Sequence, residues 1–401
     1  MKLILKSNKL RALLGGHPWV LDGSLLPFSQ TVEDGSIVDI YTEKDRFFAR
    51  GLYNGHSKIR VRLYTWNENT ELNSDFWTKK LESAIQLRKD LGYFNEGESG
   101  CSGAPSCRLA NSEGDGLSGL IVDQYGDVLS VQATALGIWR RAEELAGILM
   151  RLTGAKSVMF RAEPGMAKRE GIVLDNPDGL LFGLPVPEKM VISSGGILYE
   201  LYLSGGQKTG FYLDQKENRQ AAGRLMANRD VLDMYCYHGG FSLAASKAGA
   251  KSCLACDSSA KALEQAQVNA QLNGAGNIQF QQGDAFEILE SFKAQERLFG
   301  GVILDPPKFA QGKRSASDAL RGYHYLNKLG IACIAPGGFL VTCSCTGSVS
   351  REDFFAMLHG AASQAGRSVQ ILQQRGAGLD HPVLDACPES EYLKCFLCRV
   401  E

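Results

Sequence analysis

Long apolar runs are absent from this sequence of 401 residues. None reaches the roughly 18 residues that a membrane-spanning helix requires. The opening segment, MKLILKSNKLRALLGG, has neither the long apolar stretch nor the small-residue cleavage site of a secretion signal. We therefore expect a cytoplasmic protein that has no membrane partner.

A disulfide framework is also missing. The 11 cysteines are an odd number and are scattered through apolar segments, which favours reduced thiols. Two pairs have the C-x-x-C spacing of zinc ligands, Cys253 with Cys256 and Cys395 with Cys398. Because both pairs lie in strand-like apolar runs rather than in polar loops, we expect core cysteines and no metal site.

The sequence has almost no net charge, −1 in total, so the whole molecule does not attract a nucleic acid strongly. The local balance differs from the total. Residues 1–66 carry ten basic and six acidic side chains. The basic excess therefore lies at the N-terminal end.

The length and the change of pattern along the chain predict three domains. Residues 1–72 contain short β-rich segments separated by turns, which are typical of a small barrel. Residues 73–190 begin with a helix over 74–92 and continue as a β-rich linking domain crossed by one helix, WRRAEELAGILMRLTG. Residues 191–401 alternate apolar strands with helices, which predicts an α/β domain with a parallel, Rossmann-like sheet covered on both faces.

Aspartates stand at or near the ends of four successive predicted strands in this last domain: Asp233, Asp257, Asp284 and Asp305. A single aspartate at such a position is often only a helix cap. Four of them along one edge of a sheet favour a ligand site, because ligands of such sheets bind beyond the carboxyl ends of the strands.

The turn after the first of these strands reads Tyr235-Cys236-Tyr237-His238-Gly239-Gly240. It lacks the G-x-G-x-x-G pattern that places a pyrophosphate on a helix N-terminus. A carboxylate such as Asp257 can accept both hydroxyls of a ribose, and Asp284 is well placed for an adenine amino group. The pattern therefore favours an adenosine-type cofactor without phosphates. Its expected contacts here are Asp233, Tyr235, Tyr237, Gly239, Asp257, Asp284 and Asp305.

The segment Asp305-Pro306-Pro307-Lys308 predicts a stiff loop at the same sheet edge, because proline restricts both itself and the residue before it. Lys308 is suited to a phosphate or a base oxygen, and Phe309 offers a ring on which an unstacked base can stack. The alternative for these two residues is a solvated lysine and a core phenylalanine.

Cys343 and Cys345 fall near the end of a further strand, in VTCSCTG. A thiolate there could add to C6 of a pyrimidine and make C5 nucleophilic enough to accept a methyl group. Asp305 is a candidate for steering the base, whereas the group that removes the C5 proton stays open. Two buried core cysteines are the alternative interpretation.

Taken together, these segments resemble the PUA-domain large-subunit ribosomal RNA cytosine-C5 methyltransferases, over nearly the whole chain. The shared motifs are HPWV at 17–20, NSEGDGLSGLIVDQYGD at 111–127, GQKTGFYLDQKENR at 206–219, LDPPKFA and CSCTG. The resemblance implies a PUA domain that docks on ribosomal RNA, a linking domain and a catalytic domain that binds S-adenosylmethionine.

By the same resemblance, Cys345 is the catalytic nucleophile and Cys343 is secondary. Phe211 and Asp214 would close over the cofactor. The sequence departs from RNA methyltransferases with two catalytic cysteines, which keep one directly after the proline, where this chain has Lys308. If the reaction is C5 methylation, a single cysteine must then serve, as the resemblance to the uracil-C5 enzymes implies.

Other functions remain open at this point. The same fold could methylate guanine, uracil or an exocyclic amine, and a non-catalytic RNA-binding assembly factor or a dehydrogenase are more distant alternatives. The sequence does not identify the nucleotide, the assembly state of the RNA or the oligomeric state, although a homodimer is possible.

Overall fold

A computed structural model describes residues 1–94, 103–174, 176, 179–203, 211–309 and 316–401. The chain forms two compact units. Unit 1 contains Met1–Ser193, Leu201–Leu213 and Leu379–Ser390, and unit 2 contains Ser194–Glu200, Asp214–Gly378 and Glu391–Glu401. The finer division at residues 72 and 190 stays a prediction.

The N-terminal part of unit 1 is a five-stranded sheet in the order β1-β3-β4-β5-β2. Its strands are β1 (Lys2–Leu5), β2 (Trp19–Leu21), β3 (Ile37–Thr42), β4 (Phe47–Tyr53) and β5 (Ile59–Thr65). A short helix, α1 (Ser7–Leu13), follows β1 and was not predicted from the sequence. Only Leu13 of this helix is buried, so the segment has no apolar periodicity that could reveal it.

The second sheet of unit 1 has seven strands in the order β10-β9-β8-β7-β6-β11-β12. They are β6 (Ala104–Asn111), β7 (Leu120–Tyr125), β8 (Val128–Ala133), β9 (Ser157–Arg161), β10 (Leu180–Gly183), β11 (Lys189–Ser194) and β12 (Ile197–Tyr202). Helices α2 (Ser74–Asp90) and α4 (Ala142–Thr153) contribute to its main core, which includes Trp77 and Leu145. The predicted helix over 74–92 is confirmed.

The single crossing helix predicted for this region is an incomplete description. The segment from Leu136 forms two helices, α3 (Leu136–Trp139) and α4, and a further helix, α5 (Pro164–Glu170), follows β9. The side chain of Glu163 caps α5 by accepting the N–H groups of Gly165 and Met166, and Pro164 begins the helix. Proline suits the first helical turn because its missing N–H is not needed there.

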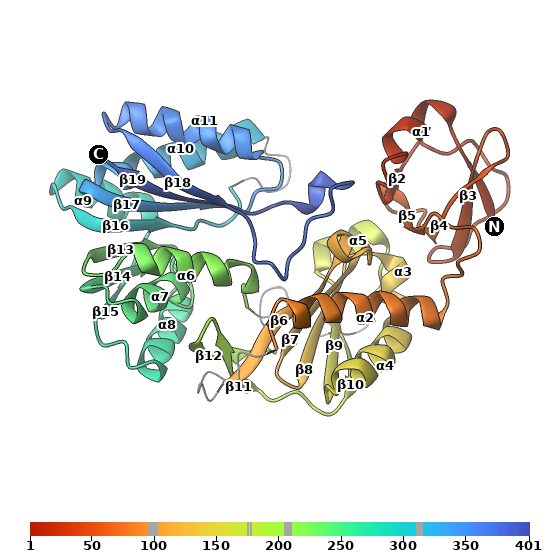
Figure 1. The fold of residues 1–401 in the computed structure, drawn as a ribbon, viewed down its shortest axis with the longest axis horizontal. Coiled ribbons are helices and arrows are strands. Elements are labelled where there is room, and N and C mark those ends of the chain that lie inside the picture. Colours follow the sequence, from red (N-terminus) through yellow and green to blue (C-terminus); the bar gives the residue numbers. More distant parts are fainter. Residues whose placement is uncertain (95–102, 175, 177–178, 204–210, 310–315) are drawn as a thin grey trace. The chain divides into compact units, whose positions relative to one another are not determined.

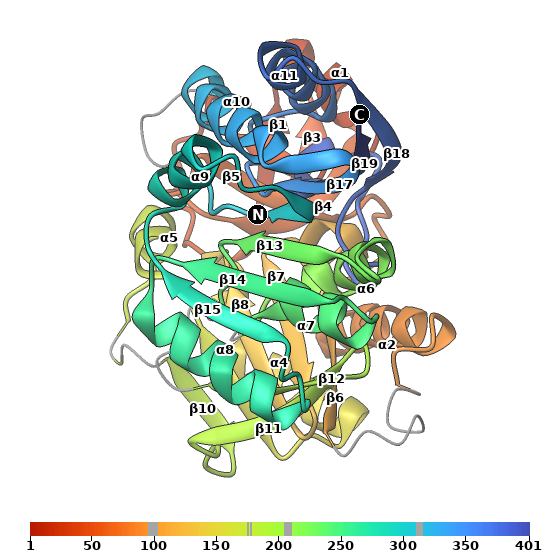
Figure 2. The ribbon, with the colours of Figure 1, turned by 90° about the vertical axis from the view of Figure 1, so that its left-hand side faces the viewer.

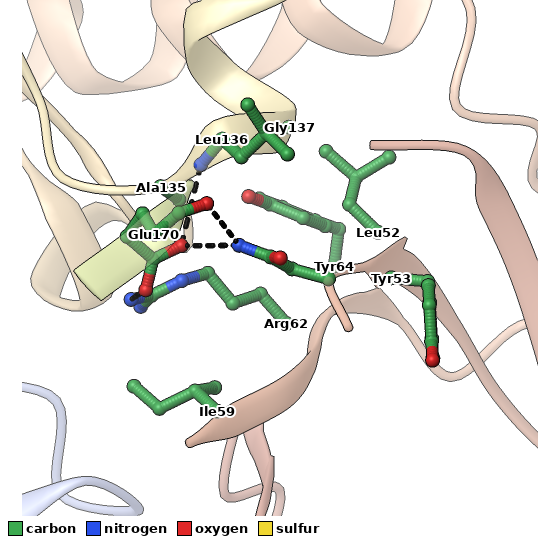
Figure 3. A pocket seen from close by; sticks show the side chains of 10 residues that line it. Leu52, Tyr53, Ile59, Arg62, Tyr64, Ala135, Leu136, Gly137 and Glu170 are labelled. Carbon is green, nitrogen blue, oxygen red and sulfur yellow. Dashed lines mark hydrogen bonds and ion pairs between the residues drawn. The ribbon is translucent and has the colours of Figure 1, made fainter. Parts of the chain in front are cut away.

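A buried polar network joins the two sheets of unit 1 and lines a small internal cavity (Figure 3). Glu170, at the end of α5, accepts hydrogen bonds from the side chain of Asn54 at 2.9 Å and from the hydroxyl of Ser57 at 2.5 Å. Arg62 lies 3.7 Å from Glu170 and 3.2 Å from Glu113. Arg62 thus pairs with both buried carboxylates, and neutral donors satisfy the remaining oxygens of Glu170, so the network can hold the two sheets together.

The motif HPWV also belongs to this buried joint, the polar network between the two sheets of unit 1. The indole Nε1 of Trp19 donates to Glu113 at 2.9 Å, so the motif binds the 111–127 segment of the second sheet. The backbone N–H of Trp19 donates to Nδ1 of His17, which leaves the proton of a neutral imidazole on Nε2, 3.3 Å from Glu389. Cys387 lies in the same cluster, but this tautomer is unsuited to metal binding at Nε2.

Unit 2 is built on a seven-stranded sheet in the order β15-β14-β13-β16-β17-β19-β18. Its strands are β13 (Asp230–Met234), β14 (Ser252–Asp257), β15 (Ile278–Gln282), β16 (Phe299–Leu304), β17 (Ile334–Ser344), β18 (Val369–Arg375) and β19 (Lys394–Val400). The sheet is parallel from β15 to β17, but β19 runs antiparallel to both β17 and β18. The prediction of an all-parallel sheet is therefore wrong at this edge, where strand β18 was not predicted.

Helices cover both faces of this sheet, as the sequence predicts (Figures 1 and 2). Helices α9 (Ala285–Ala294), α10 (Ala316–Ala332) and α11 (Arg351–Gln364) lie on one face. Helices α6 (Lys216–Leu225), α7 (Gly240–Lys247) and α8 (Ala260–Leu272) lie on the other. The predicted Rossmann-like α/β class is confirmed for this unit.

Both C-x-x-C pairs lie within strands of this sheet, and all four thiols are buried. They pack as core side chains, as the alternation of the sequence predicts. Among the described residues, no helix is long and apolar enough to cross a membrane.

Candidate active site

Four aspartates lie along the carboxyl edge of the sheet in unit 2. Asp257 is the last residue of β14, Asp233 is the last but one of β13, and Asp284 and Asp305 follow β15 and β16. These four strands are parallel neighbours, so their carboxyl ends share one edge. The structure thus places the predicted carboxylates together, although their roles toward a cofactor stay a prediction.

Asp233 is fully buried below this edge. Its Oδ2 accepts the backbone N–H and the hydroxyl of Ser242 at 3.0 and 2.6 Å, which ties the strand to the first turn of α7. Burial raises the pKa of Asp233 to about 7, although the hydrogen bonds of Ser242 oppose the shift. Its Oδ1 is buried and accepts no hydrogen bond from the described residues, so a partner from a ligand or water is needed to satisfy it.

The turn between β13 and α7 has an unusual backbone. Tyr235 and Tyr237 have positive φ values of 63° and 50°, and Gly239 has φ 80°. A residue with a side chain is costly in this region, about 1–3 kcal/mol, and such strain is concentrated at functional sites. The conformation is held in place, since the N–H of Tyr237 donates to Asp257 at 2.9 Å and its ring stacks on His238.

Asp257 and Asp284 already bind backbone N–H groups. Asp257 accepts the N–H of Ser259 at 2.9 Å through its second oxygen. Asp284 is exposed and caps α9 by accepting the N–H groups of Phe286 and Glu287. The helix-cap interpretation therefore applies to Asp284, whose Oδ1 accepts both N–H groups. Oδ2 of Asp284 and a lone pair on each oxygen of Asp257 could accept an amino group or a hydroxyl.

Asp305 lies between the cofactor edge and the cysteine strand. Gln215 donates to its Oδ1 at 3.1 Å. Burial raises the pKa of Asp305 to about 6, and the positive charge of Arg219 opposes this shift. Asp305 is therefore a carboxyl group that can hold or release a proton near neutral pH.

Arg219, on α6, was missed by the sequence reasoning. It is 7% exposed, and its positive charge opposes the rise that burial causes in the pKa values of Asp233, Asp305 and Tyr199. It also lies against Gly240, where an added Cβ would come within 2.5 Å of its Nε. A buried arginine among carboxylates is suited to binding an anionic group. The only sequence signal was a basic residue on the apolar side of a short helix.

Asp214 and Phe211 belong to different units. In unit 2, Asp214 is buried, accepts the hydroxyl of Tyr392 and, through its carbonyl, binds the N–H of Gly378 at 2.9 Å. In unit 1, Phe211 is buried and its N–H donates to the hydroxyl of Tyr125 at 3.1 Å. Residues 206–210 of the same motif lie outside the described residues.

Cys345 directly follows β17, and it is the one described cysteine that is not buried. Its Sγ lies 3.9 Å from the carbonyl oxygen of Pro306, next to Asp305. Cys343 is fully buried opposite Cys395, and burial raises the pKa of its thiol well above the ordinary value. Of the two candidates, only Cys345 has the exposure that a nucleophile requires.

The residues predicted to contact the substrate have different surroundings. Lys308 is exposed. Phe309 is half-buried, with its ring centre 4.7 Å from that of Tyr323 and 6.3 Å from that of Phe286. Part of this ring therefore serves the core, and its role as a stacking platform stays a prediction.

Lys394, the first residue of β19, was also missed. It is 2% exposed, and its Nζ donates to the carbonyl oxygens of Thr346 and Tyr392 at 2.7 and 2.9 Å. Burial lowers the pKa of Lys394 to about 8, and negative charge on Glu391 and Cys345 opposes this shift. No sequence pattern could reveal its contact with the loop of Cys345, because Thr346 lies 48 positions before it in the chain.

The charged side chains at this edge of the sheet match the chemical groups of S-adenosylmethionine. The unmatched oxygen of Asp233 and the carboxyl of Asp305 suit positively charged groups, and Arg219 suits a carboxylate. Asp257 suits a ribose diol, and the turn at Gly239 lacks the pattern that binds a pyrophosphate.

Comparison with known proteins agrees with this chemistry. Residues 3–66 match the PUA-like domain family, and residues 172–391 match the family described as S-adenosylmethionine-dependent methyltransferase. A crystal structure of a methyltransferase complexed with SAH has a TM-score of 0.84 at 20% identity, and both chains are covered completely. An S-adenosylmethionine-dependent methyltransferase from Streptococcus mutans gives 0.82 at 20% identity, again over both whole chains. The fold and the site therefore define an S-adenosylmethionine-dependent methyltransferase.

Curated relatives identify the family more narrowly. The chain is 36% identical to ribosomal RNA large subunit methyltransferase I of Aeromonas hydrophila, over 99% of this chain and 98% of the relative. It is 33% identical to the protein of the same name from Erwinia tasmaniensis, over 100% and 99%. The chain belongs to the ribosomal RNA large subunit methyltransferase I family.

Proposed function

We propose that this enzyme methylates C5 of a cytosine in large-subunit ribosomal RNA, with the thiolate of Cys345 as the nucleophile. The observation that carries the proposal is the position of Cys345. It is the one described cysteine that is not buried, and it lies beside the Asp305-Pro306 edge where the cofactor is expected. The ribosomal target is inferred from the names of the relatives and from the PUA-like domain.

The cofactor, when bound, supplies an electrophilic methyl group. We assign the ribose to Asp257 and the adenine to Asp284, and the turn of Tyr235, Tyr237 and Gly239 lines the site between them. Asp233, with its unmatched oxygen, and Arg219 are assigned to the amino acid part. Phe211 and Asp214 are proposed to cover the cofactor.

The chain's own residues would activate the base. The Cys345 thiolate adds to C6, so that the electron pair moves toward C5, which then forms the bond to the methyl group. A base that the described residues do not identify then takes the C5 proton, the C–H electron pair re-forms the C5–C6 double bond, and the C6–S bond breaks with its electron pair returning to sulfur. Asp305, whose pKa is about 6, can share a proton with N3 of the base and hold its orientation.

The remaining contacts hold the flipped-out base and its strand. Lys308 is exposed and can bind a phosphate, and the free part of the Phe309 ring can stack on the base. The N-terminal domain would bind RNA beyond the target nucleotide, where its basic excess lies.

The covalent step can be tested with RNA that carries 5-fluorocytosine at the target. Fluorine cannot leave as a proton does, so the enzyme is expected to remain bound through sulfur after methyl transfer. We expect the wild-type enzyme and Cys343→Ala to form this complex on a denaturing gel, and Cys345→Ala to form none. Turnover of ordinary RNA by Cys345→Ala should fall by at least about a thousandfold.

Normal methylation by Cys345→Ala would refute the thiol mechanism and favour an exocyclic amine or guanine target. A uracil target would be revealed by mass-spectrometric nucleoside analysis of ribosomal RNA from cells with and without the gene. Calorimetry with S-adenosylmethionine tests the remaining alternative, because a non-catalytic assembly factor need not bind it.

A further inference from the structure

Lys394 contacts the loop that carries Cys345. In the antiparallel pair of β17 and β19, Lys394 lies opposite Ser344, the residue directly before Cys345. Its Nζ donates to the carbonyl oxygen of Thr346, the residue directly after Cys345, at 2.7 Å. Lys394 therefore contacts the residues on both sides of Cys345. Its main chain is paired with Ser344, and its side chain binds the carbonyl oxygen of Thr346.

The hydrogen bonding of Lys394 leaves one position on nitrogen undefined. The carbonyl oxygens of Thr346 and Tyr392 accept two N–H groups. A neutral amine has two N–H groups and a lone pair, whereas an ammonium group has three N–H groups. Either form satisfies both carbonyls, so the third position can hold a proton or accept one without breaking this arrangement.

We propose that Lys394 is the positioning residue that controls the ionisation of Cys345, because its buried ammonium group favours the thiolate over the thiol. In this step the S–H bond breaks, the proton passes to water, and the electron pair stays on sulfur. The result is a thiolate beside a buried ammonium group. The proposal rests on the assignment of Cys345 as nucleophile and deepens it.

Among the described residues, the other charges that act on Lys394 do not replace it. Arg351 and Glu391 form an ion pair with each other, so their effects largely cancel. Lys308 is exposed and therefore screened by water. On the side of Cys345, burial raises the pKa of Tyr323 to about 12 and keeps it neutral, and negative charge on Asp305 opposes a thiolate.

Burial also brings the pKa of Lys394 closer to neutral pH. Burial lowers the pKa of Lys394 to about 8, and the charge of Cys345 raises it in part. At pH 7 such a lysine is still mostly protonated, so its positive charge is available to lower the pKa of a nearby thiol from its ordinary value of about 8.5.

The test measures the reactivity of Cys345 without RNA or methyl transfer. The rate of alkylation by iodoacetamide is followed from pH 6 to pH 10 by mass spectrometry of the peptide that contains Cys345. For Lys394→Met we expect a rate about tenfold lower at pH 7 and a midpoint about one unit higher, because the thiolate loses its cation. Lys261→Met, an exposed lysine on α8, should leave both values unchanged.

A second variant protects the test against misfolding of Lys394→Met. Coupling between two groups is reciprocal. In Cys345→Ala, acylation of Lys394 by acetic anhydride should therefore have a lower pH midpoint than in the wild type. An unchanged midpoint in that variant, or an unchanged alkylation profile in folded Lys394→Met, would overturn the proposal. If the fluorocytosine complex forms while these midpoints do not move, only the role of Lys394 fails.

Discussion

At the scale of single residues, unit 2 keeps ionisable groups in places where burial disfavours their charge. The buried group with the clearest consequence is Asp233, because it is fully enclosed and one of its oxygens has no partner among the described residues. A buried carboxylate without a partner lowers the stability of the fold, and proteins keep such groups at functional sites. The cost is measurable, since it depends on pH.

Asp233→Asn tests this cost. Burial raises the pKa of Asp233 from 3.8 to about 7, so the folded protein binds the proton more tightly than the unfolded chain. Native stability therefore falls as pH rises from about 4 to about 7, and the ionised group is destabilising above that range. We expect the variant to be on the order of 2–4 kcal/mol more stable than the wild type at pH 8, with little difference at pH 4.

Urea unfolding without cofactor at the two pH values measures the effect. Asp284→Asn is the matched control, since Asp284 is an exposed helix cap and asparagine caps equally well. It should change stability by less than about 0.5 kcal/mol at either pH. Equal or lower stability of Asp233→Asn at pH 8 would contradict the account, whereas the variant should bind S-adenosylmethionine more weakly.

Several residues of the site could be predicted from the sequence, and others could not. Asp233, Asp257, Asp284 and Asp305 were predictable because a strand ends locally, where apolar alternation stops. Arg219 and Lys394 were not, because their importance comes from partners distant in the chain. Lys394 acts through Thr346, 48 positions before it.

At the scale of elements, strand pairing depends on close approach of main chains. In the N-terminal sheet, Gly51 of β4 faces β5 so closely that an added Cβ would lie 2.2 Å from the carbonyl oxygen of Arg62. A carbonyl of a paired strand cannot move away as a flexible side chain can. The position therefore requires glycine.

Gly51→Ala should separate β4 from β5 and destabilise the N-terminal sheet by about 1–3 kcal/mol. We expect faster amide hydrogen exchange in β4 and β5 and weaker RNA binding, with cofactor binding unchanged. Gly147→Ala is the control, because Gly147 lies within α4 with nothing within 4 Å of the added Cβ. That helical substitution should be neutral or stabilising by up to about 1 kcal/mol. Unaltered exchange in the Gly51 variant would show that the strands adjust.

Elements with strong apolar patterns were predictable, and weakly patterned ones were not. The run SCLACD at 252–257 coincides with strand β14, and α2 begins at Ser74 as expected. Strand β18 is mostly exposed at the sheet edge, so its pattern resembled a loop. Its pairing with β19 depends on a connection through Leu379–Ser390, which belongs to unit 1.

At the scale of the whole molecule, charge is distributed unevenly although it almost cancels. Six basic residues of the N-terminal sheet region are exposed. Lys2 pairs with Asp45, and the other five are Lys9, Arg11, Lys44, Arg46 and Lys58. Other basic residues of that region form ion pairs: Arg60 pairs with Asp22, and Arg62 pairs with Glu113 in the buried network. RNA attraction should therefore depend on the exposed set, because buried or paired cations release few counterions.

Replacing all five by glutamine should weaken RNA binding and flatten its salt dependence. Each phosphate contact that is lost lowers the slope of log affinity against log salt by about 0.7 for a single strand. Turnover at saturating RNA should stay within about twofold, because these residues are not assigned to the chemistry. Fluorescence anisotropy at several salt concentrations measures the slope.

The control replaces exposed lysines of unit 2, namely Lys251, Lys261 and Lys293. This variant should keep the wild-type salt slope. If the two variants lose affinity equally, RNA binding depends on net charge rather than on the N-terminal sheet.

The amino-acid sequence was sufficient for the α/β class of the catalytic unit, the row of carboxylates and the choice of an adenosine-type cofactor. These features follow from local alternation and from residues within a few positions of a strand end. The antiparallel last strand, the buried joint around Glu170, and the positions of Arg219 and Lys394 were decided by the folded chain alone. Their energies come from desolvation and pairing between distant segments, which arise only when the segments pack together.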